Sequence, residues 1–390
     1  MSTSQQAFVT KDVLTWARKR LGDTIESASH KLKIEPDTLK SWEDGTTYPT
    51  MTQAKRIAKK LTIPFGYLFL STPPEDLKVP LPDFRSVTVR ETSEVSPEFS
   101  DLFNDVLVKQ DWYKQHLIEK GKKPLKFVGS HSIASGIDQV AASIGDAIDI
   151  EAHRTDAVSW ADFLRRLITS AESIGVIVMK SGVVGANNQR PLSVDEFRGF
   201  AIADSIAPLV FINGRDAVSA QIFTLIHELA HIWIASDGIS RPDLSKKSSR
   251  QPNDVERFCD SVAVEVLVPH EAFLAAWDND ASIDSNIHEL ARRFHVSLVV
   301  VLRRAYDLDE LTSDEFTFRL NREFRREARP KSDGGNFYAT VRVRNSGTLT
   351  DALVESALTG RVLLLDAAKM LHVKIGTIEK MPEKMPLRKT

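Results

Sequence analysis

The stretch that decides the fold runs from Ala217 to Ile234 and reads AVSAQIFTLIHELAHIWI. Apolar residues occur on every side of this segment at helical spacing, which predicts one long helix inside a core. Its ionisable residues are His227, Glu228 and His231, which form an HExxH motif. Two histidines four positions apart lie on one face of a helix, about one turn from each other. Both imidazoles can therefore reach one Zn²⁺ ion, and the glutamate between them can accept a proton from bound water.

A helix predicted from Asp254 to Leu267 carries the next candidates. Glu256 and Asp260 lie one turn apart on the same face, with apolar residues around them. We expect Glu256 to be the third metal ligand. We expect Asp260 to accept the free N–H of a ligand histidine and so to fix its tautomer. Cys259 is a rival ligand, but a lone buried cysteine is more often a small packing residue.

Each of these helices also has a simpler interpretation. The histidines can be a structural pair, and the two carboxylates can face solvent. Burying three ionisable groups in an apolar helix is costly, however, unless a partner such as a metal ion offsets the cost. The two helices together favour a metal site, because the second one supplies the missing ligand. Three protein ligands leave a fourth position open, which is typical of a catalytic zinc site.

Composition places the chain among ordinary soluble proteins. It has 390 residues, of which 42% are hydrophobic and 27% charged, and its formal net charge is −2. These values exclude wholesale disorder and a polyanion binder that is basic over its whole length. The single cysteine excludes an internal disulfide and cysteine-based zinc knuckles. No apolar stretch has the length of a membrane span and the N-terminus does not resemble a signal peptide, so we expect a cytoplasmic protein without membrane contacts.

The sequence divides into four segments. Residues 1–72 contain short helical patterns over 10–70, which predict a small all-α domain. Residues 73–98 hold several prolines among charged and hydroxyl residues, which predicts a semi-extended linker. Residues 99–278 mix helical and strand patterns and predict an α+β domain. Residues 279–390 predict a mainly helical C-terminal domain.

The α+β segment contains three predicted strands, at 176–179, 198–202 and 208–212. A predicted helix over 160–174 precedes them, with Ser159 as its cap. A polar loop is predicted over 236–252, between the two helices that carry the candidate metal ligands.

Several of these stretches resemble a known family. EFRGF at 196–200, the run 208–213, FTLIHELAH at 223–231 and the ExxCD core that closes with LVP over 256–269 are similar to the ImmA/IrrE family of zinc metallopeptidases. The resemblance covers about residues 155–275. It implies a zincin-like, gluzincin-type α+β fold and a repressor-like helix-turn-helix protein as substrate. A role in transcription regulation during a stress response follows from the same resemblance.

The resemblance also implies roles for individual residues. His227, His231 and Glu256 are then the zinc ligands, and Glu228 is the general base. The family usually has alanine followed by asparagine or aspartate where this chain has Cys259-Asp260, and Phe-Ala-Ala where it has Val-Ala-Val at 262–264. Neither departure removes a ligand.

Residues 10–70 resemble an Xre-type, lambda-repressor-like helix-turn-helix domain. Ala28 matches the position of close helix contact and Ile34 the turn. Leu39 and Trp42 match the core side of the recognition helix. The resemblance implies an all-α fold for this module.

DNA and protein are alternative partners of this module. Residues 10–62 hold eleven basic and seven acidic residues, a surplus that favours contact with phosphate. Thr38, Lys40 and Ser41 on the predicted recognition helix are the candidate DNA contacts. The recognition helix with its ends, residues 35–44, carries four carboxylates (Glu35, Asp37, Glu43 and Asp44) against Lys40 alone, and carboxylates repel phosphate. The alternative is docking of a protein, either a repressor's helix-turn-helix or a second copy of this chain in a homodimer.

The sequence thus predicts a zinc-dependent endopeptidase that cleaves a repressor-like regulatory protein, with an N-terminal module for DNA binding or substrate targeting. One alternative is a DNA-binding transcriptional regulator or antitoxin-like protein that retains a zincin fold. A weaker one is a metal-dependent stress sensor that acts through partners alone. The intact Glu228 beside both histidines favours the enzyme, because a degenerate site would lose this residue at little cost to folding.

Overall fold

The chain forms two compact units, each with its own hydrophobic core. The first contains the residues before 75 together with 96–100, and the second contains those from Asp101 onward. The computed structural model describes residues 5–74, 96–235, 238–240, 254–324 and 336–384.

The N-terminal unit is a cluster of short helices, as predicted for residues 10–70. Its helices are α1 (Lys11–Arg20), α2 (Ile25–Leu32), α3 (Pro36–Glu43), α4 (Met51–Lys60) and the 3₁₀ helix η1 (Phe65–Phe69). Local signals set these boundaries. The Thr24 hydroxyl accepts the N–H of Ser27 at 3.2 Å, and Pro36 takes the first helical position of α3. The apolar faces meet in a core that includes the fully buried Leu39.

The second unit is built on a four-stranded sheet with the order β1-β3-β2-β4. β1 and β3 are parallel, and the other neighbouring strands are antiparallel. The first three strands are those predicted from the sequence, with boundaries that differ slightly. The strands are β1 (Ile177–Ser181), β2 (Gly199–Ile202), β3 (Leu209–Asn213) and β4 (Gly238–Ser240).

The fourth strand corrects the prediction of a polar loop over 236–252. Residues 238–240 pair antiparallel with β2, and Phe200 stands opposite Ile239. A segment this short gives no strand pattern of its own, because the hydrogen bonds that define it come from the neighbouring strand. The rest of the predicted loop lies outside the described residues.

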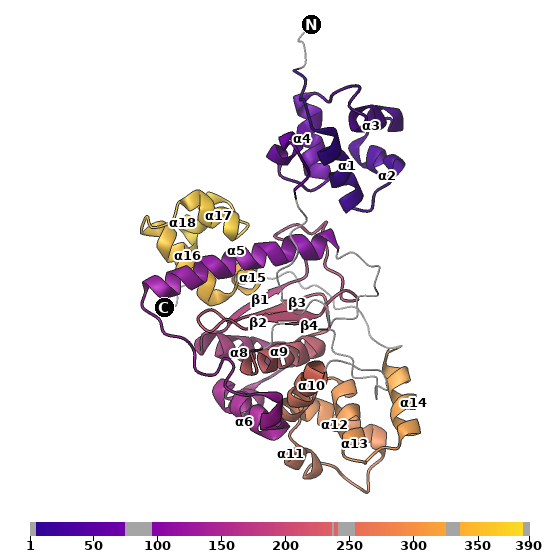
Figure 1. Cartoon of the computed structure of the whole chain (residues 1–390). Coiled ribbons are helices and arrows are strands. Elements are labelled where there is room, and N and C mark those ends of the chain that lie inside the picture. The colour runs from indigo at the N-terminus through magenta and orange to yellow at the C-terminus, as the bar shows by residue number, and fades with distance from the viewer. Residues whose placement is uncertain (1–4, 75–95, 236–237, 241–253, 325–335, 385–390) are drawn as a thin grey trace. The chain divides into compact units, whose positions relative to one another are not determined.

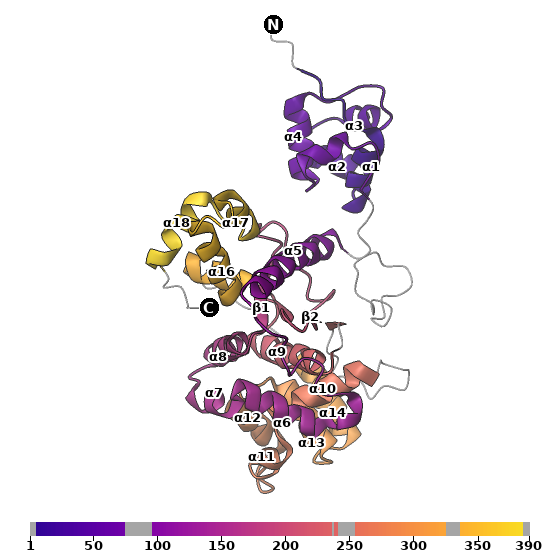
Figure 2. The ribbon, with the colours of Figure 1, turned by 60° about the vertical axis from the view of Figure 1, so that its left-hand side comes forward.

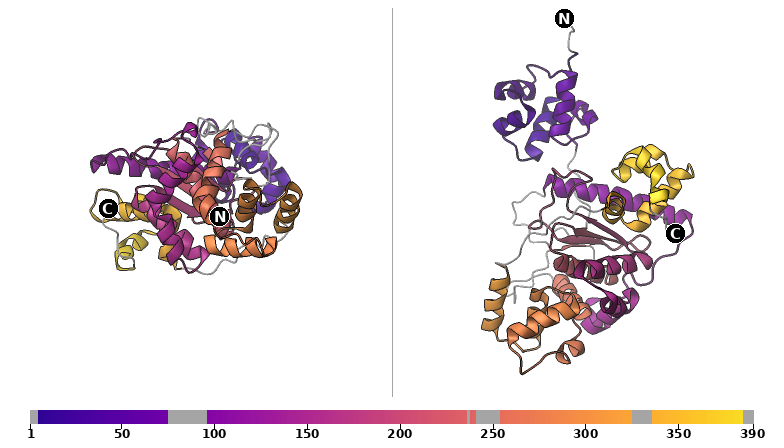
Figure 3. Two further views of the ribbon diagram at one scale, coloured as in Figure 1. Left: turned by 90° about the horizontal axis from the view of Figure 1, so that it is seen from below. Right: turned by 180° about the vertical axis from the view of Figure 1, so that it is seen from behind.

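Helices cover both faces of the sheet (Figure 1). One face carries α5 and the other carries α8 and α9, an arrangement also visible from behind (Figure 3). β3 is buried at every position because it is covered on both sides. A helix-rich unit with one small sheet confirms the α+β class. Its helices are α5 (Pro97–Glu119), η2 (Ile133–Ser135), α6 (Ile137–Ile148), α7 (Ile150–Asp156), α8 (Trp160–Ser173), α9 (Val218–Trp233), α10 (Asp254–Leu267), α11 (His270–Leu274), α12 (Ile283–Phe294), α13 (Leu298–Asp307), α14 (Ser313–Phe324), α15 (Phe337–Asn345), α16 (Gly347–Leu358), α17 (Leu364–Met370) and α18 (Ile375–Lys384).

α9 lies at the centre of this core. Every residue from Gln221 to Trp233 is buried, which explains the apolar positions on all sides of the motif helix. The Trp233 ring stacks on Phe127 with centroids 4.4 Å apart, and its Nε1 donates to Ser143 Oγ at 3.0 Å. These contacts fix the end of the helix just beyond His231.

The helices after residue 279 belong to two groups. α12–α14 contribute to the same core as α9 and α10. α15–α18 gather beside α5 and β1, on the opposite face of the sheet (Figure 2). The helical character predicted for 279–390 is confirmed for the described residues, while the domain boundary at 278/279 stays a prediction.

The predicted linker over 73–98 lies mostly outside the described residues. Its last two positions belong to α5, which begins at Pro97, because proline is tolerated in the first turn of a helix. None of the described helices combines the length and the apolar composition that crossing a membrane requires.

A buried carboxylate joins α8 to the C-terminal group of helices. Glu172 is 6% exposed and accepts hydrogen bonds from the Ser346 hydroxyl at 2.7 Å and the Gly347 N–H at 2.6 Å. Gly347 is the first residue of α16, whose own N-cap side chain makes no capping bond. Glu172 therefore caps this helix from another part of the chain, where a negative charge is favourable.

We expect Glu172→Ala to destabilise the second unit by about 2–3 kcal/mol, because it leaves the buried N–H of Gly347 without its charged acceptor. Urea unfolding followed by tryptophan fluorescence measures the change. Glu289→Ala, at an exposed position of α12, is the matched control and should change the stability little. Equal losses in the two variants would contradict the capping role.

Candidate metal centre

The helices α9 and α10 bring the three predicted ligands together. The side chains of His227 and His231 are fully buried, and that of Glu256 is 31% exposed. The Nε2 atoms of the two histidines are 3.1 Å apart. Glu256 Oε2 lies 3.4 Å from Nε2 of His227, and Glu256 Oε1 lies 3.3 Å from Nε2 of His231. Among the described residues these side chains form a group whose ligand atoms all lie within 4.8 Å of one another.

The spacing of these atoms fits a small tetrahedral ion. Ligands about 2.0–2.2 Å from Zn²⁺ at tetrahedral angles stand about 3.3–3.6 Å from one another. The observed separations of 3.1, 3.3 and 3.4 Å are close to this edge length. Imidazole nitrogen and carboxylate oxygen are also ligand types that zinc accepts. The residues present therefore fit a zinc ion.

Asp260 contacts the opposite side of one ligand ring. Its Oδ1 lies 2.9 Å from Nδ1 of His227, at ion-pair distance although the ring N–H is not aligned for a good hydrogen bond. Without a metal, burial lowers the pKa of His227, but the carboxylates of Asp260 and Glu256 outweigh burial and raise this pKa well above its usual value. A metal ion must therefore displace a proton to bind here, and its affinity should fall with falling pH.

Glu228 is fully buried where α9 meets the sheet. A Cβ atom added to Gly199 of β2 would lie 2.9 Å from Oε1 of Glu228. The same atom would lie 2.4 Å from Cγ2 of Thr224 and 2.8 Å from the carbonyl oxygen of Phe211. Only a residue without a side chain lets the strand approach the helix this closely.

Gly199 is therefore a site residue that the sequence prediction does not include. A glycine inside a predicted strand is the signal for a close approach of another backbone or side chain. That signal alone does not say which element approaches. The structure identifies it as the helix that carries the HExxH motif.

Cys259 packs in the core and is not part of the ligand group. It is fully buried among apolar residues of the second unit. Burial, together with the carboxylates of Glu256, Glu228 and Asp260, raises the pKa of its thiol. The thiolate that a metal requires is therefore disfavoured here, which agrees with the packing role expected from the sequence.

The predicted DNA contacts lie on α3, in the N-terminal unit. Lys40 is exposed, whereas Thr38 and Ser41 are partly buried. The Ser41 hydroxyl donates to the Thr38 carbonyl oxygen at 2.8 Å and lies 2.6 Å from the hydroxyl of Thr47. Lys40 is thus the candidate best placed to meet a partner.

An ion pair changes the charge of this helix. Glu43 accepts bonds from Nε and Nη2 of Arg18 at 2.7 and 2.8 Å, and its side chain is 8% exposed. One of the four carboxylates predicted to repel phosphate is therefore neutralised within the unit. Glu35, Asp37 and Asp44 remain exposed.

A buried HExxH pair completed by a glutamate from a second helix is the arrangement of a metal-dependent peptidase. Residues 173–306 match the family model Peptidase_M78, described as the IrrE N-terminal-like domain. The match supports the ImmA/IrrE family and a peptidase, and the family is metal-dependent. It covers the sheet, α9 and α10, and so includes every residue of the candidate centre. The N-terminal unit lies outside the matched range, and no curated protein matches the chain.

We expect Gly199→Ala to lower the stability of the second unit by about 1–3 kcal/mol, because the new methyl group overlaps Thr224 and forces β2 away from α9. Differential scanning calorimetry measures the shift in melting temperature. Gly145→Ala is the control, since its added Cβ would lie 3.5 Å from Ile150, an ordinary contact. Adding Thr224→Ser to Gly199→Ala removes the nearest methyl group and should restore part of the loss. Identical melting of the two single variants would show that the approach at Gly199 is not tight.

Proposed function

We propose that this chain is a zinc-dependent endopeptidase with a zincin-like, gluzincin-type catalytic domain, and that its substrate is a repressor-like helix-turn-helix protein. The observation that carries the proposal is the convergence of His227, His231 and Glu256 within 4.8 Å, with Glu228 buried on the same helix as the histidines. The match of residues 173–306 to a peptidase family supports it independently.

Each residue of the centre has a chemical role in this proposal. His227, His231 and Glu256 hold the ion, and Asp260 fixes the orientation of the His227 ring. Zinc, when bound, supplies a Lewis acid that activates water and polarises the scissile carbonyl group. Glu228 accepts the proton of the attacking water and delivers it to the leaving amine. Its burial beside β2 restricts the positions that its carboxylate can take.

The proposed role of the N-terminal unit is to bind DNA through α3. Two observations support DNA as the partner, against the three carboxylates of this region that remain exposed. The Arg18–Glu43 ion pair removes one negative charge from the helix, and Lys40 stays exposed on it. On α3, contact with phosphate would come from this lysine. The alternative role, docking a repressor or a second copy of the chain, is an outcome of the experiment below.

We expect wild-type protein to hold one zinc ion per chain and His231→Ala to lose it, because two ligands do not retain the metal. Glu228→Gln should keep the zinc and reduce cleavage by at least about 100-fold, since it removes the general base. Elemental analysis gives the metal content. Incubation with the repressor-like protein encoded by a neighbouring gene, followed by gel electrophoresis, gives the cleavage. His288→Ala and Glu289→Gln, at exposed positions of α12, are the matched controls.

The possible results separate the alternatives. If the Glu228→Gln variant lost its zinc but still cleaved the substrate, the role of general base assigned to Glu228 would be wrong. Zinc in the wild type without cleavage would favour a transcriptional regulator or antitoxin-like protein that retains the zincin fold. No zinc in any variant would mean that the motif is a structural histidine pair.

We expect the chain to bind DNA with an affinity that falls steeply with salt, and Lys40→Glu to weaken binding at least about tenfold, because it reverses a charge that meets phosphate. A gel-shift titration with a random-sequence DNA pool at two salt concentrations measures both effects. Lys59→Glu, an exposed position on α4, is the control for the change in net charge. Absence of salt-dependent binding would favour the protein-docking role.

A further inference from the structure

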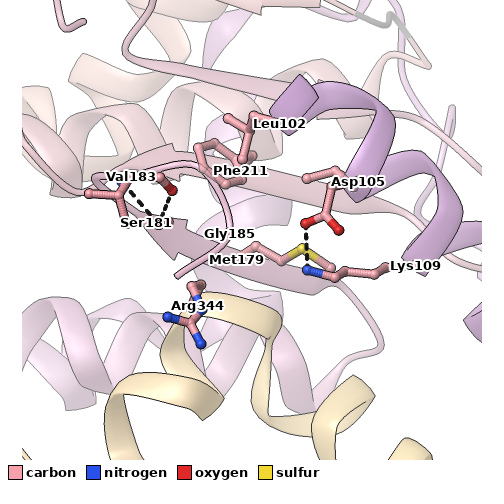
Figure 4. A pocket seen from close by; sticks show the side chains of 10 residues that line it. Leu102, Asp105, Lys109, Met179, Ser181, Val183, Gly185, Phe211 and Arg344 are labelled. Carbon is pink, nitrogen blue, oxygen red and sulfur yellow. Dashed lines mark hydrogen bonds and ion pairs between the residues drawn. The ribbon is translucent and has the colours of Figure 1, made fainter. Parts of the chain in front are cut away.

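A small pocket lies on the face of the sheet opposite α9, between α5, β1 and α15 (Figure 4). It is partly open to solvent, and the space inside it is about 10 Å³, which holds one water-sized particle. The pocket contains none of the residues of the candidate metal centre. Its lining residues are Leu102, Asp105, Val106, Lys109, Met179, Ser181, Val183, Gly185, Phe211 and Arg344.

One carboxylate in this pocket is shared between two basic groups. Asp105 Oδ2 lies 2.6 Å from Nζ of Lys109, and Asp105 Oδ1 lies 2.9 Å from Nε2 of His372. Lys109 is 2% exposed and also donates to Oδ1 of Asn345 at 2.8 Å. The acceptors of Asp105 are therefore occupied by Lys109 and His372.

A second cation reaches the pocket from the other side. Arg344 enters from α15, and its Nη2 donates to the carbonyl oxygen of Leu371 at 3.3 Å, a long contact. Its Nε is buried and has no hydrogen-bond partner among the described residues. A guanidinium keeps its charge at all ordinary pH values. Leaving its buried Nε–H without an acceptor therefore costs free energy.

The charges around the pocket do not balance. Asp105 is the one acidic side chain in the lining, and it faces the cations Lys109 and Arg344. Burial lowers the pKa values of both cations because it disfavours their charged forms, and the charge of Asp105 offsets this only in part. An anion placed between them would supply that charge and an acceptor for Nε of Arg344.

We propose that this pocket binds one halide ion between Lys109 and Arg344. The size of the cavity limits the ion to about that of a halide and disfavours larger anions such as phosphate. Gly185 contributes to this limit, because an added Cβ there would lie 3.2 Å from the ring of His372. The backbone at Gly185, which forms one wall of the pocket, thus lies close to His372, the histidine that pairs with Asp105.

The bound anion would strengthen the contact between the C-terminal helices and the rest of the second unit. Lys109 belongs to α5 and Arg344 to α15, so a shared anion bridges two elements that are far apart in the sequence. Asn345, next to Arg344, already contacts Lys109 across the same boundary. The anion would therefore add a second polar link between α5 and α15, beside the hydrogen bond from Lys109 to Asn345.

The full-length protein tests this proposal by thermal unfolding at constant ionic strength, with sodium gluconate replaced stepwise by chloride or phosphate. We expect chloride to raise the melting temperature saturably, by at least about 3 °C, and phosphate to have no such effect. Arg344→Gln should abolish the response, and the exposed Arg361→Gln should keep it.

An unchanged melting temperature in the wild type, or an equal response in Arg344→Gln, would overturn the proposal. Crystals of the wild-type chain soaked in bromide provide a second test that does not need the variant to fold. An anomalous peak beside Nε of Arg344 is expected, and its absence would also overturn the proposal.

Discussion

The second unit depends on the burial of three ionisable side chains on one helix. His227, Glu228 and His231 have no exposed surface, and an unpaired charge in such surroundings costs several kcal/mol or more. α9 can lie at the centre of the core only because α10 presents Glu256 and Asp260 to it. The relative position of these two helices is therefore set by electrostatics as well as by packing. The sheet completes the arrangement, since the absence of a side chain at position 199 lets β2 lie directly against the motif helix.

The sheet separates two polar sites of different character. The face under α9 carries the ligand triad, in which carboxylates face imidazoles. The face under α5 carries the cluster around Asp105, in which cations are in excess. Phe211 of the central strand takes part in both, through its side chain in the pocket and its carbonyl oxygen beside Gly199. A strand buried on both faces can in this way hold two sites at a fixed distance from each other.

Local patterns predicted much of this molecule, and long-range contacts account for what they missed. The spacing of the histidines defines their common face on any helix, and the same holds for Glu256 and Asp260, so the ligand set was accessible from the sequence. β4 was not, because its hydrogen bonds come from β2. The ion pair between Arg18 and Glu43 joins residues on α1 and α3, and the contact between Asp105 and His372 spans most of the second unit. No periodicity within either segment indicates such a partner.

The lone cysteine has a consequence for how this chain can respond to oxidants. A thiol reacts with peroxide as the thiolate, and it must be reachable from solvent. Cys259 meets neither condition, because it is fully buried and its carboxylate neighbours disfavour the anion. The second unit is therefore protected from direct oxidation of a thiol. If the protein acts during oxidative stress, the redox signal reaches it by a route other than oxidation of its cysteine.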